Sequence, residues 1–106
     1  MNWINLTTMS ELDKIKEDSF QSHQFIFKHS TRCSISKMVL SRFESTNDSA
    51  SLSVYLLDLL NYRNLSNQIE DDFKIKHESP QLLVIKDGEC CKHSSHTSIH
   101  QLNLFE

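Results

Sequence analysis

The chain has 106 residues, of which 38% are hydrophobic and 24% are charged, and its formal net charge is −3. This length suits one domain with its own core, so we treat residues 1–106 as a single domain. The composition excludes a disordered chain and a membrane protein, and the absence of a basic cluster argues against nucleic acid or an anionic membrane as partner.

The cysteines and the first 20 residues indicate the compartment. Three cysteines are an odd number, and Cys90 and Cys91 are adjacent, so the sequence suggests no disulfide framework. Acidic and basic residues interrupt residues 1–20, which therefore do not resemble a signal peptide. We expect reduced thiols and a cytoplasmic protein.

Helix and strand patterns alternate through the first half of the chain. We expect a helix over residues 8–22, begun by Ser10 and Asp13 as a capping pair. The aromatic and β-branched segment Gln24–His29 predicts a buried strand. A second helix is expected over Ser34–Thr46, followed by a loop at residues 47–49. The apolar stripes of these two helices would be formed by Leu12, Ile15 and Phe20, and by Ile35, Met38, Val39 and Phe43.

The next segment predicts a second strand and a third helix. The alternating and then continuously apolar Ser51–Leu57 is typical of a central strand. Asn61 or Asn64 would cap the helix that follows. Residues 76–79 would form a loop. The apolar stripe of this third helix consists of Tyr62, Leu65, Ile69 and Phe73.

The end of the chain predicts a β-hairpin and a short helix. Pro80 is excluded from a central strand because it lacks an amide donor. Strands over Gln81–Lys86 and Glu89–Lys92 would be joined by Asp87-Gly88, a strong two-residue hairpin signal. Ser94 and Ser95 would cap the last helix, which carries Ile99, Leu102 and Phe105.

These elements follow the order αβαβαββα. The first two strands require a right-handed parallel crossover, and the hairpin adds an antiparallel pair. We therefore expect an α/β fold of three layers, with a four-stranded mixed sheet and helices on both of its faces.

Cys33 lies where the first strand ends and the second helix begins, after Ser30 and Thr31, which are both common N-cap residues. Unpaired amides and the positive end of the helix dipole at such a position favour a thiolate over a thiol. Arg32 adds a neighbouring cation. The position predicts a nucleophilic cysteine, although a buried, inert cysteine before a helix is the more common case.

Ser36 stands where a C-x-x-C redox pair has its second cysteine. A serine can hydrogen-bond a thiolate but cannot resolve a mixed disulfide. Cys33 to Ser36 therefore predicts monothiol chemistry, which stops at a mixed disulfide and needs an outside thiol.

The other two cysteines leave one alternative open. Cys90, Cys91, His93 and His96 are close in sequence, but neighbouring strand residues point to opposite faces, so we expect no metal site. Whether Cys90 or Cys91 resolves Cys33 does not follow from the sequence.

Several segments together resemble the bacillithiol-system YtxJ family of monothiol bacilliredoxins. They are HSTRCSIS, YLLDLLNYRNLSNQI, KHESPQLLVIKDG and residues 93–96, so the likeness covers nearly the whole chain. The family often has Thr-Cys-Pro-Ile-Ser, where this chain has Arg32-Cys33-Ser34-Ile35-Ser36. The missing proline leaves the first helical turn less preorganised.

The resemblance implies a thioredoxin-like fold with an additional N-terminal helix, and Cys33 as the nucleophile. It also implies that Pro80 is the cis-proline of that fold, facing Cys33. Ser79 and Pro80 would then orient the substrate, with Thr31 as a further substrate-binding residue, while Arg32 and Ser36 would stabilise the thiolate.

The expected function is a monothiol thiol–disulfide oxidoreductase that removes a low-molecular-weight thiol from client proteins carrying mixed disulfides. Bacillithiol as co-substrate is implied by the resemblance alone, and we expect no bound cofactor or metal. The alternatives are a non-catalytic binding module of the same fold and a stress-related thiol sensor.

Overall fold

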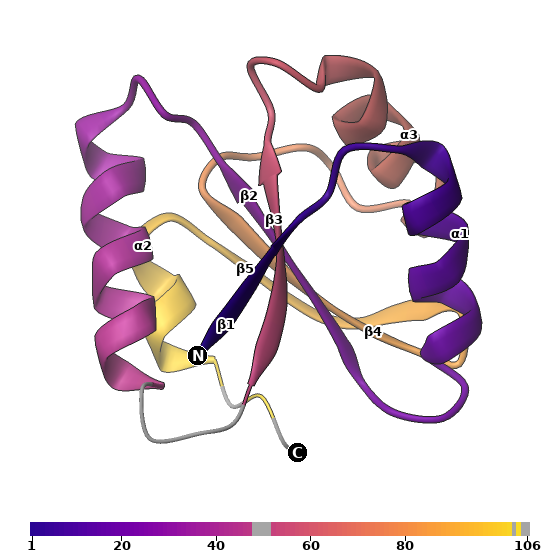
Figure 1. The fold of residues 1–106 in the computed structure, drawn as a ribbon. Helices are drawn as coiled ribbons and strands as arrows, with labels where there is room; N and C mark the ends of the chain where they lie inside the picture. The colour runs from indigo at the N-terminus through magenta and orange to yellow at the C-terminus, as the bar shows by residue number, and fades with distance from the viewer. Residues whose placement is uncertain (48–51, 103, 105–106) are drawn as a thin grey trace.

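The computed structural model describes residues 1–47, 52–102 and 104. Its described strands form one mixed sheet in the spatial order β1-β3-β2-β4-β5. Figure 1 shows α2 and the 3₁₀-helix η1 on one face of the sheet and α1 and α3 on the other. The elements are β1 (Asn2–Asn5), α1 (Met9–Asp18), β2 (Gln24–His29), α2 (Ser34–Thr46), β3 (Ser53–Asp58), α3 (Arg63–Phe73), β4 (Gln81–Lys86), β5 (Glu89–Ser95) and η1 (His96–Gln101).

The sheet has one strand more than the sequence predicted. β1 pairs in parallel with β3, from Asn2 beside Ser53 to Asn5 beside Leu56. The prediction missed it because the strand is short and asparagine is depleted in strands. The Trp3 ring packs edge-on against Phe27, with 5.8 Å between centroids. The first helix is therefore not the first element but the connection from β1 to β2.

The start of α1 is fixed by a capping box two residues before the predicted one. The Thr8 hydroxyl accepts the amide N–H of Glu11 at 3.1 Å, and the Glu11 carboxylate accepts the amide N–H of Thr8 at 3.0 Å. Ser10 lies inside the helix, so the predicted cap of Ser10 and Asp13 is wrong. Both pairs have the sequence spacing of a capping box, and only the backbone conformation distinguishes them.

α1 ends four residues earlier than predicted and packs against the β4–β5 hairpin. The Ser19 carbonyl accepts the Asp87 N–H at 3.0 Å, and the Ser19 hydroxyl accepts the Gly88 N–H at 2.8 Å. Asp87 and Gly88 both have positive φ, 53° and 77°, which confirms the predicted hairpin turn. Phe20 lies beyond the helix and is 62% exposed, so it is not part of a buried stripe.

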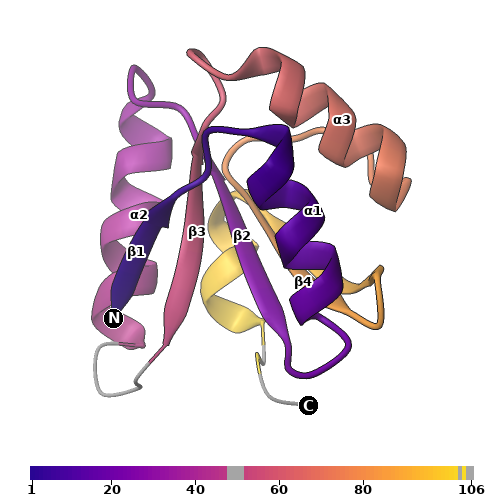
Figure 2. The same ribbon diagram turned by 45° about the vertical axis from the view of Figure 1, so that its right-hand side comes forward.

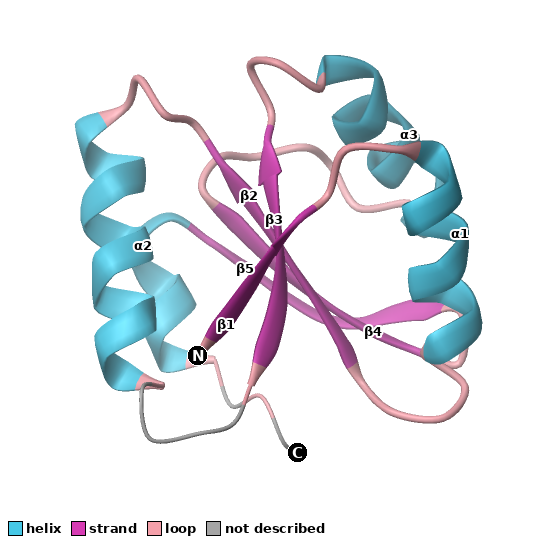
Figure 3. Cartoon of the chain, viewed as in Figure 1, coloured by secondary structure: helices cyan, strands magenta, loops and turns pink. Residues whose placement is uncertain are grey.

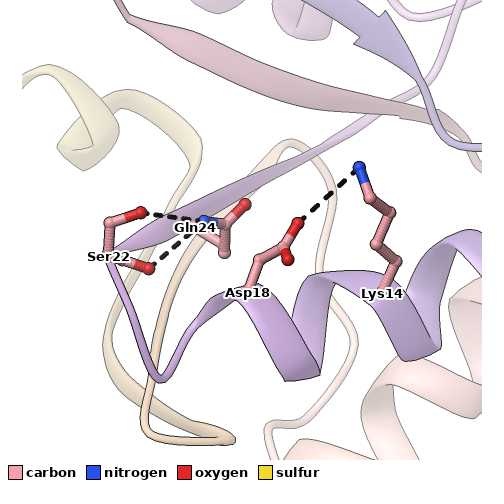
Figure 4. A network of polar contacts seen from close by, with 4 residues as sticks. All are labelled: Lys14, Asp18, Ser22 and Gln24. Atoms are coloured by element: carbon pink, nitrogen blue, oxygen red, sulfur yellow. Dashed lines mark hydrogen bonds and ion pairs between the residues drawn. The ribbon is translucent and has the colours of Figure 1, made fainter.

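Polar side chains make surface contacts at the end of α1 and in the turn that leads to β2 (Figure 4). Lys14 and Asp18 form an i,i+4 ion pair at 3.7 Å, and the Gln24 amide donates to the Ser22 carbonyl at 3.2 Å. Exposed pairs of this kind contribute little to stability. They lie at the amino end of β2, away from its carboxyl end, where Cys33 follows.

α2 has the predicted bounds, but its buried face is rotated. Ser36, Val39 and Phe43 are buried, whereas Ile35 and Met38 are about half exposed. Hydrophobicity alone favoured the wrong stripe because a serine occupies a core position.

α3 begins at Arg63 without the predicted cap. Its N-cap residue is Tyr62, which makes no side-chain capping bond. The Asn61 amide instead donates to the Asp58 carboxylate at 2.7 Å, and Asn64 lies within the helix. The predicted stripe is confirmed for the buried residues Leu65, Ile69 and Phe73.

The C-terminal strand is longer than predicted, because β5 continues through Ser94 and Ser95. Ser95 occupies the N-cap position of η1 but makes no side-chain cap bond, and Ile99 is buried. β3 begins at Ser53, and the predictions for residues 48, 49, 51 and 105 fall outside the described residues.

One lysine is enclosed in the apolar core between the sheet and α3. Lys28 is fully buried; its ammonium donates to the Ser66 carbonyl at 3.2 Å and lies 3.3 Å from His77 Nδ1. Burial lowers the pKa of Lys28 to about 8, although Glu70 opposes this shift and Arg63 adds to it. Burial also lowers the pKa of His77. A charge therefore lies under the carboxyl end of β2.

Changing Thr8 to alanine tests the start of α1. The Thr8→Ala variant loses one half of the capping box, and we expect its free energy of unfolding to fall by about 1 kcal/mol. The matched control is Ser10→Ala, which replaces an exposed residue inside the helix and is expected to change stability little. Urea unfolding of both variants checks this. A larger loss in Ser10→Ala would contradict the structure.

The buried lysine predicts a pH-dependent stability. Its pKa is about 8 when folded, against an ordinary value near 10.5, so between these values the unfolded chain holds a proton that the folded chain lacks. Stability should therefore rise with pH in this range. Relative to Lys28→Met, we expect the wild type to gain about 1 to 2 kcal/mol from pH 8 to pH 9.5. Other titrating groups cancel in this difference, and parallel pH profiles would contradict the assignment.

Candidate functional site

Cys33 occupies the N-cap position of α2. Its backbone is extended, with φ −102° and ψ 119°. Its N–H donates to the Ser30 carbonyl at 3.2 Å, and its own carbonyl accepts the Lys37 N–H at 3.0 Å. The thiol is free, partly exposed and not engaged in a capping hydrogen bond. The loop therefore holds the sulfur at the helix start without using it structurally.

Hydrogen-bond donors and a cationic side chain lie around the Cys33 thiol at the start of α2. The amides of Ser34–Ser36 belong to the first helical turn, which has no intrahelical acceptors for them. No acidic residue lies in that turn, so the positive end of the helix dipole is not neutralised locally. Arg32 is exposed beside Cys33 and makes no ion pair with any described residue.

Ser36 is fully buried and bonded away from Cys33. Its hydroxyl lies 2.7 Å from His29 Nδ1 and accepts the Ser30 N–H at 3.1 Å. These are its hydrogen-bond partners among the described residues, so the expected bond from Ser36 to the sulfur is not present. Ser36 instead ties the end of β2 to the start of α2. It positions Cys33 by fixing the loop between them.

His29 is a site residue that the sequence reasoning missed. It is 6% exposed at the carboxyl end of β2, and burial lowers its pKa, with Lys37 adding to this shift and Asp58 opposing it. Burial therefore favours the neutral imidazole over the imidazolium. The available signal was its place in Lys28-His29-Ser30, at the strand end four residues before the cysteine.

Ser79 and Pro80 precede the strand that lies beside β2. β4 pairs antiparallel with β2, with Gln81 beside Lys28, so Pro80 is at the same end of the sheet as Cys33. The Ser79–Pro80 peptide bond is cis, and the Pro80 carbonyl accepts the His96 N–H at 2.9 Å. The Ser79 hydroxyl is buried without a hydrogen-bond partner among the described residues.

Thr31 is exposed in the loop before Cys33. It lines a pocket of about 320 Å³ together with His29 and the ends of β1 and β3. The structure therefore places Thr31, His29 and Cys33 on one short segment. Ser79 and Pro80 approach from the neighbouring strand, so all the predicted site residues lie at one end of the sheet.

Cys90 and Cys91 lie at the opposite end of the sheet. Cys90 pairs with Ile85, which in turn pairs with Gln24 at the start of β2, whereas Cys33 follows the end of that strand. A strand of this length spans about 17 to 20 Å, and a disulfide requires Cα atoms within about 7 Å. Neither cysteine can resolve Cys33 in this fold. Burial raises the pKa of the Cys90 thiol to about 11.

No metal-binding arrangement or membrane span occurs within residues 1–47, 52–102 and 104. No three His, Cys, Asp or Glu side chains converge there as metal ligands. None of the helices in those segments has the length and apolar character needed to cross a bilayer.

Removing the Ser36 hydroxyl tests its positioning role. The Ser36→Ala variant leaves the Ser30 amide unpaired in a partly buried position, and we expect a loss of about 1 to 3 kcal/mol in the free energy of unfolding. The matched control is Ser34→Ala in the same turn, where the side chain is exposed and a small change is expected. Equal stabilities of the two variants in urea unfolding would show that Ser36 does not brace the loop.

Comparison with solved structures identifies the fold. A protein described as a candidate oxidoreductase with a thioredoxin fold matches with a TM-score of 0.83 and 27% identity, over 96% of this chain and 87% of its own. Thioredoxin from Schistosoma mansoni gives 0.72 at 17% identity, over 94% of this chain and 88% of its own. A mutant thioredoxin from Halobacterium salinarum gives 0.71 at 15%, over 94% and 82%. The expected thioredoxin-like fold is confirmed.

The family follows from the sequence match. The model of the family described as monothiol bacilliredoxin BrxC matches residues 4–104, which is nearly the whole chain. The match spans the Cys33 loop, Ser36 and the Ser79–Pro80 pair. The protein therefore belongs to the monothiol bacilliredoxin BrxC family of thiol oxidoreductases with a thioredoxin fold.

Proposed function

We propose that this protein removes a low-molecular-weight thiol, bacillithiol, from mixed disulfides on client proteins, with Cys33 as the nucleophile. The observation that carries the proposal is the free, partly exposed Cys33 thiol at the start of a helix whose first turn has no acid. Membership of the monothiol bacilliredoxin family supports the choice of small thiol.

The proposed reaction has two exchange steps. The Cys33 thiolate attacks the sulfur of the small thiol, the bond from that sulfur to the client cysteine breaks, and the client leaves as a thiolate that takes a proton from water. Cys33 now carries the small thiol in a mixed disulfide. A second molecule of free bacillithiol, as thiolate, attacks the small-thiol sulfur of this disulfide. The bond between this sulfur and Cys33 breaks, the two bacillithiol molecules leave joined as a disulfide, and the Cys33 thiolate is regenerated.

The absence of a nearby second thiol supports the monothiol course. Ser36 occupies the place of a resolving cysteine, and the register of the sheet puts Cys90 and Cys91 at its far end. No internal disulfide with Cys33 can therefore form without unfolding. Release of the small thiol must depend on an external thiol, which makes the free thiol a co-substrate and not a bound cofactor.

Ser79 and Pro80 are proposed to orient the client. The Ser79 amide and carbonyl make no hydrogen bond with the described residues, and its hydroxyl is also without a partner. An extended client segment can pair with such free backbone groups in the manner of an added strand. We propose that Arg32 and Thr31 contact the incoming disulfide from the other side of Cys33. The three free cysteines fit a reducing compartment, and we propose the cytoplasm.

Turnover with a defined substrate tests the function. The substrate is a protein whose single cysteine carries bacillithiol, with excess free bacillithiol present, and the released client thiol is measured. We expect many turnovers per wild-type molecule and a loss of at least about a hundredfold in Cys33→Ser, since the nucleophile is absent. The matched control, Cys91→Ser, removes an exposed thiol far from the site and should retain wild-type turnover.

The outcomes separate the three candidate functions. Turnover by Cys33→Ser at the wild-type rate would contradict the proposal. A single stoichiometric adduct on Cys33 that free bacillithiol does not remove would favour a thiol sensor. Binding of the client without an adduct on Cys33 would favour a non-catalytic module.

A further inference from the structure

A pocket of about 320 Å³ opens at the carboxyl ends of β1, β3 and β2. Figures 1 and 2 show these three strand ends together at the same end of the sheet. From these ends, β2 leads to α2 on one face of the sheet, whereas β1 and β3 lead to α1 and α3 on the other (Figure 3). Connections that diverge in this way leave a crevice at the strand ends, which is where open α/β sheets commonly bind ligands.

A buried histidine forms part of the pocket wall. His29 is only 6% exposed, and its Nδ1 is hydrogen-bonded to the Ser36 hydroxyl. Its Nε2 has no hydrogen-bond partner among the described residues. Among the described residues, the Ser79 hydroxyl is the side-chain polar atom that is both fully buried and without a hydrogen-bond partner. Since His29 Nε2 also lacks a partner but is not fully buried, it keeps some contact with solvent. Because His29 lines the pocket, this free nitrogen is the polar side-chain atom that His29 can offer to a ligand bound there.

The hydrogen-bond pattern determines which nitrogen of His29 carries the proton. Ser36 is fully buried, and its oxygen already accepts the Ser30 N–H. Its hydroxyl proton has one acceptor within reach, His29 Nδ1, at 2.7 Å. In a neutral imidazole the proton is then on Nε2. With the proton on Nε2, His29 offers the pocket an N–H donor that has no acceptor among the described residues.

The other polar groups of the pocket show what it accepts. The two Asp58 oxygens are occupied by the Leu60 N–H at 3.2 Å and the Asn61 amide at 2.7 Å. The carboxylate is therefore engaged in shaping its own loop. Thr31 adds an exposed hydroxyl two residues from Cys33, a separation of at most about 7 Å between Cα atoms. A substituent attached to the Cys33 sulfur is within reach of this region.

We propose that this pocket binds the polar part of the small thiol while its sulfur is bonded to Cys33. The His29 Nε2–H donates to a hydroxyl or carboxylate oxygen of the thiol, and Thr31 contributes a second polar contact. The inference rests on the proposed exchange at Cys33 and assigns its small-thiol subsite. The client is then left to the Ser79–Pro80 side, so the two substrates lie on opposite sides of the sulfur.

Nuclear magnetic resonance of trapped adducts tests the subsite. In Cys91→Ser protein, Cys33 is converted to its mixed disulfide with 1-thioglycerol or with the hydrocarbon analogue 2-methylbutanethiol, which has the same shape but no oxygen. Long-range ¹H–¹⁵N spectra report the tautomer and environment of each histidine ring. We expect the free protein to show His29 as the Nε2–H tautomer. The Nε2 signal should shift in the thioglycerol adduct and much less in the hydrocarbon adduct.

Exchange rates give a second, independent readout. The substrates are two peptides whose single cysteine is disulfide-bonded to thioglycerol or to the hydrocarbon thiol. The rate at which the protein releases each peptide thiol is divided by the rate at which dithiothreitol alone releases it, which corrects for the intrinsic reactivity of each disulfide. We expect a wild-type preference of about fivefold for the thioglycerol cap, the value of one hydrogen bond. His29→Asn keeps an acceptor for Ser36 but lacks the pocket donor, and its preference should fall to about one. The matched control, His100→Asn, changes an exposed histidine and should keep the fivefold preference.

The outcomes distinguish failure of the subsite from failure of the proposed function. If neither thiol forms an adduct on Cys33, the exchange chemistry and the subsite are both wrong. If both adducts form but the His29 ring responds equally, or is the Nδ1–H tautomer, the subsite is wrong while exchange at Cys33 stands. An unchanged preference in His29→Asn would also overturn it.

Discussion

The Ser36 hydroxyl, bonded at once to the His29 ring and the Ser30 amide, is the constraint on which the site depends. It joins the last residue of β2 to the first turn of α2, with the Ser36 side chain fully buried. The loop between them is therefore fixed at both ends, and Cys33 is presented at the helix start with its sulfur free. In the proposed small-thiol subsite, the same hydroxyl donates to His29 Nδ1 and leaves the proton of the ring on Nε2. One buried hydroxyl thus links the position of the nucleophile to the proposed polarity of the neighbouring pocket.

The serine of the Cys-x-x-Ser motif consequently has a different role from the one its spacing suggests. In a dithiol protein the second cysteine attacks the mixed disulfide, and we expected Ser36 to replace that contact with a hydrogen bond to the sulfur. The structure instead uses the position for support. The motif is monothiol because a serine has no thiol with which to resolve a mixed disulfide. Cys90 and Cys91 do not replace it, since both lie at the far end of the sheet.

Much of the fold was predictable because local signals agreed with the tertiary structure. The apolar run of β4, the Asp87-Gly88 turn and the bounds of α2 all followed from residue type and spacing. β1 was missed because its stability comes from pairing with β3 and from Trp3 packing on Phe27, which are contacts made across the sequence. The 3₁₀ geometry of η1 and the greater length of β5 likewise depend on tertiary packing.

The candidate site was partly predictable for the same reason. The position of Cys33 followed from the strand-to-helix boundary, and the role of Arg32 followed from its charge beside that cysteine. The roles of Thr31, Ser79 and Pro80 came from resemblance, and all four roles stay predictions. His29 was missed, because a histidine at a strand end carries no local mark of its partner seven residues later.

The residue that receives the small thiol distinguishes Cys33 from the other two cysteines as the nucleophile. The wild-type protein is mixed with a bacillithiol-capped client, free thiols are blocked with acid and alkylating agent, and peptide mass spectrometry locates the small thiol. We expect bacillithiol on Cys33 alone, with loss of the adduct after free bacillithiol is added. An adduct on Cys90 or Cys91 with Cys33 unmodified would contradict it.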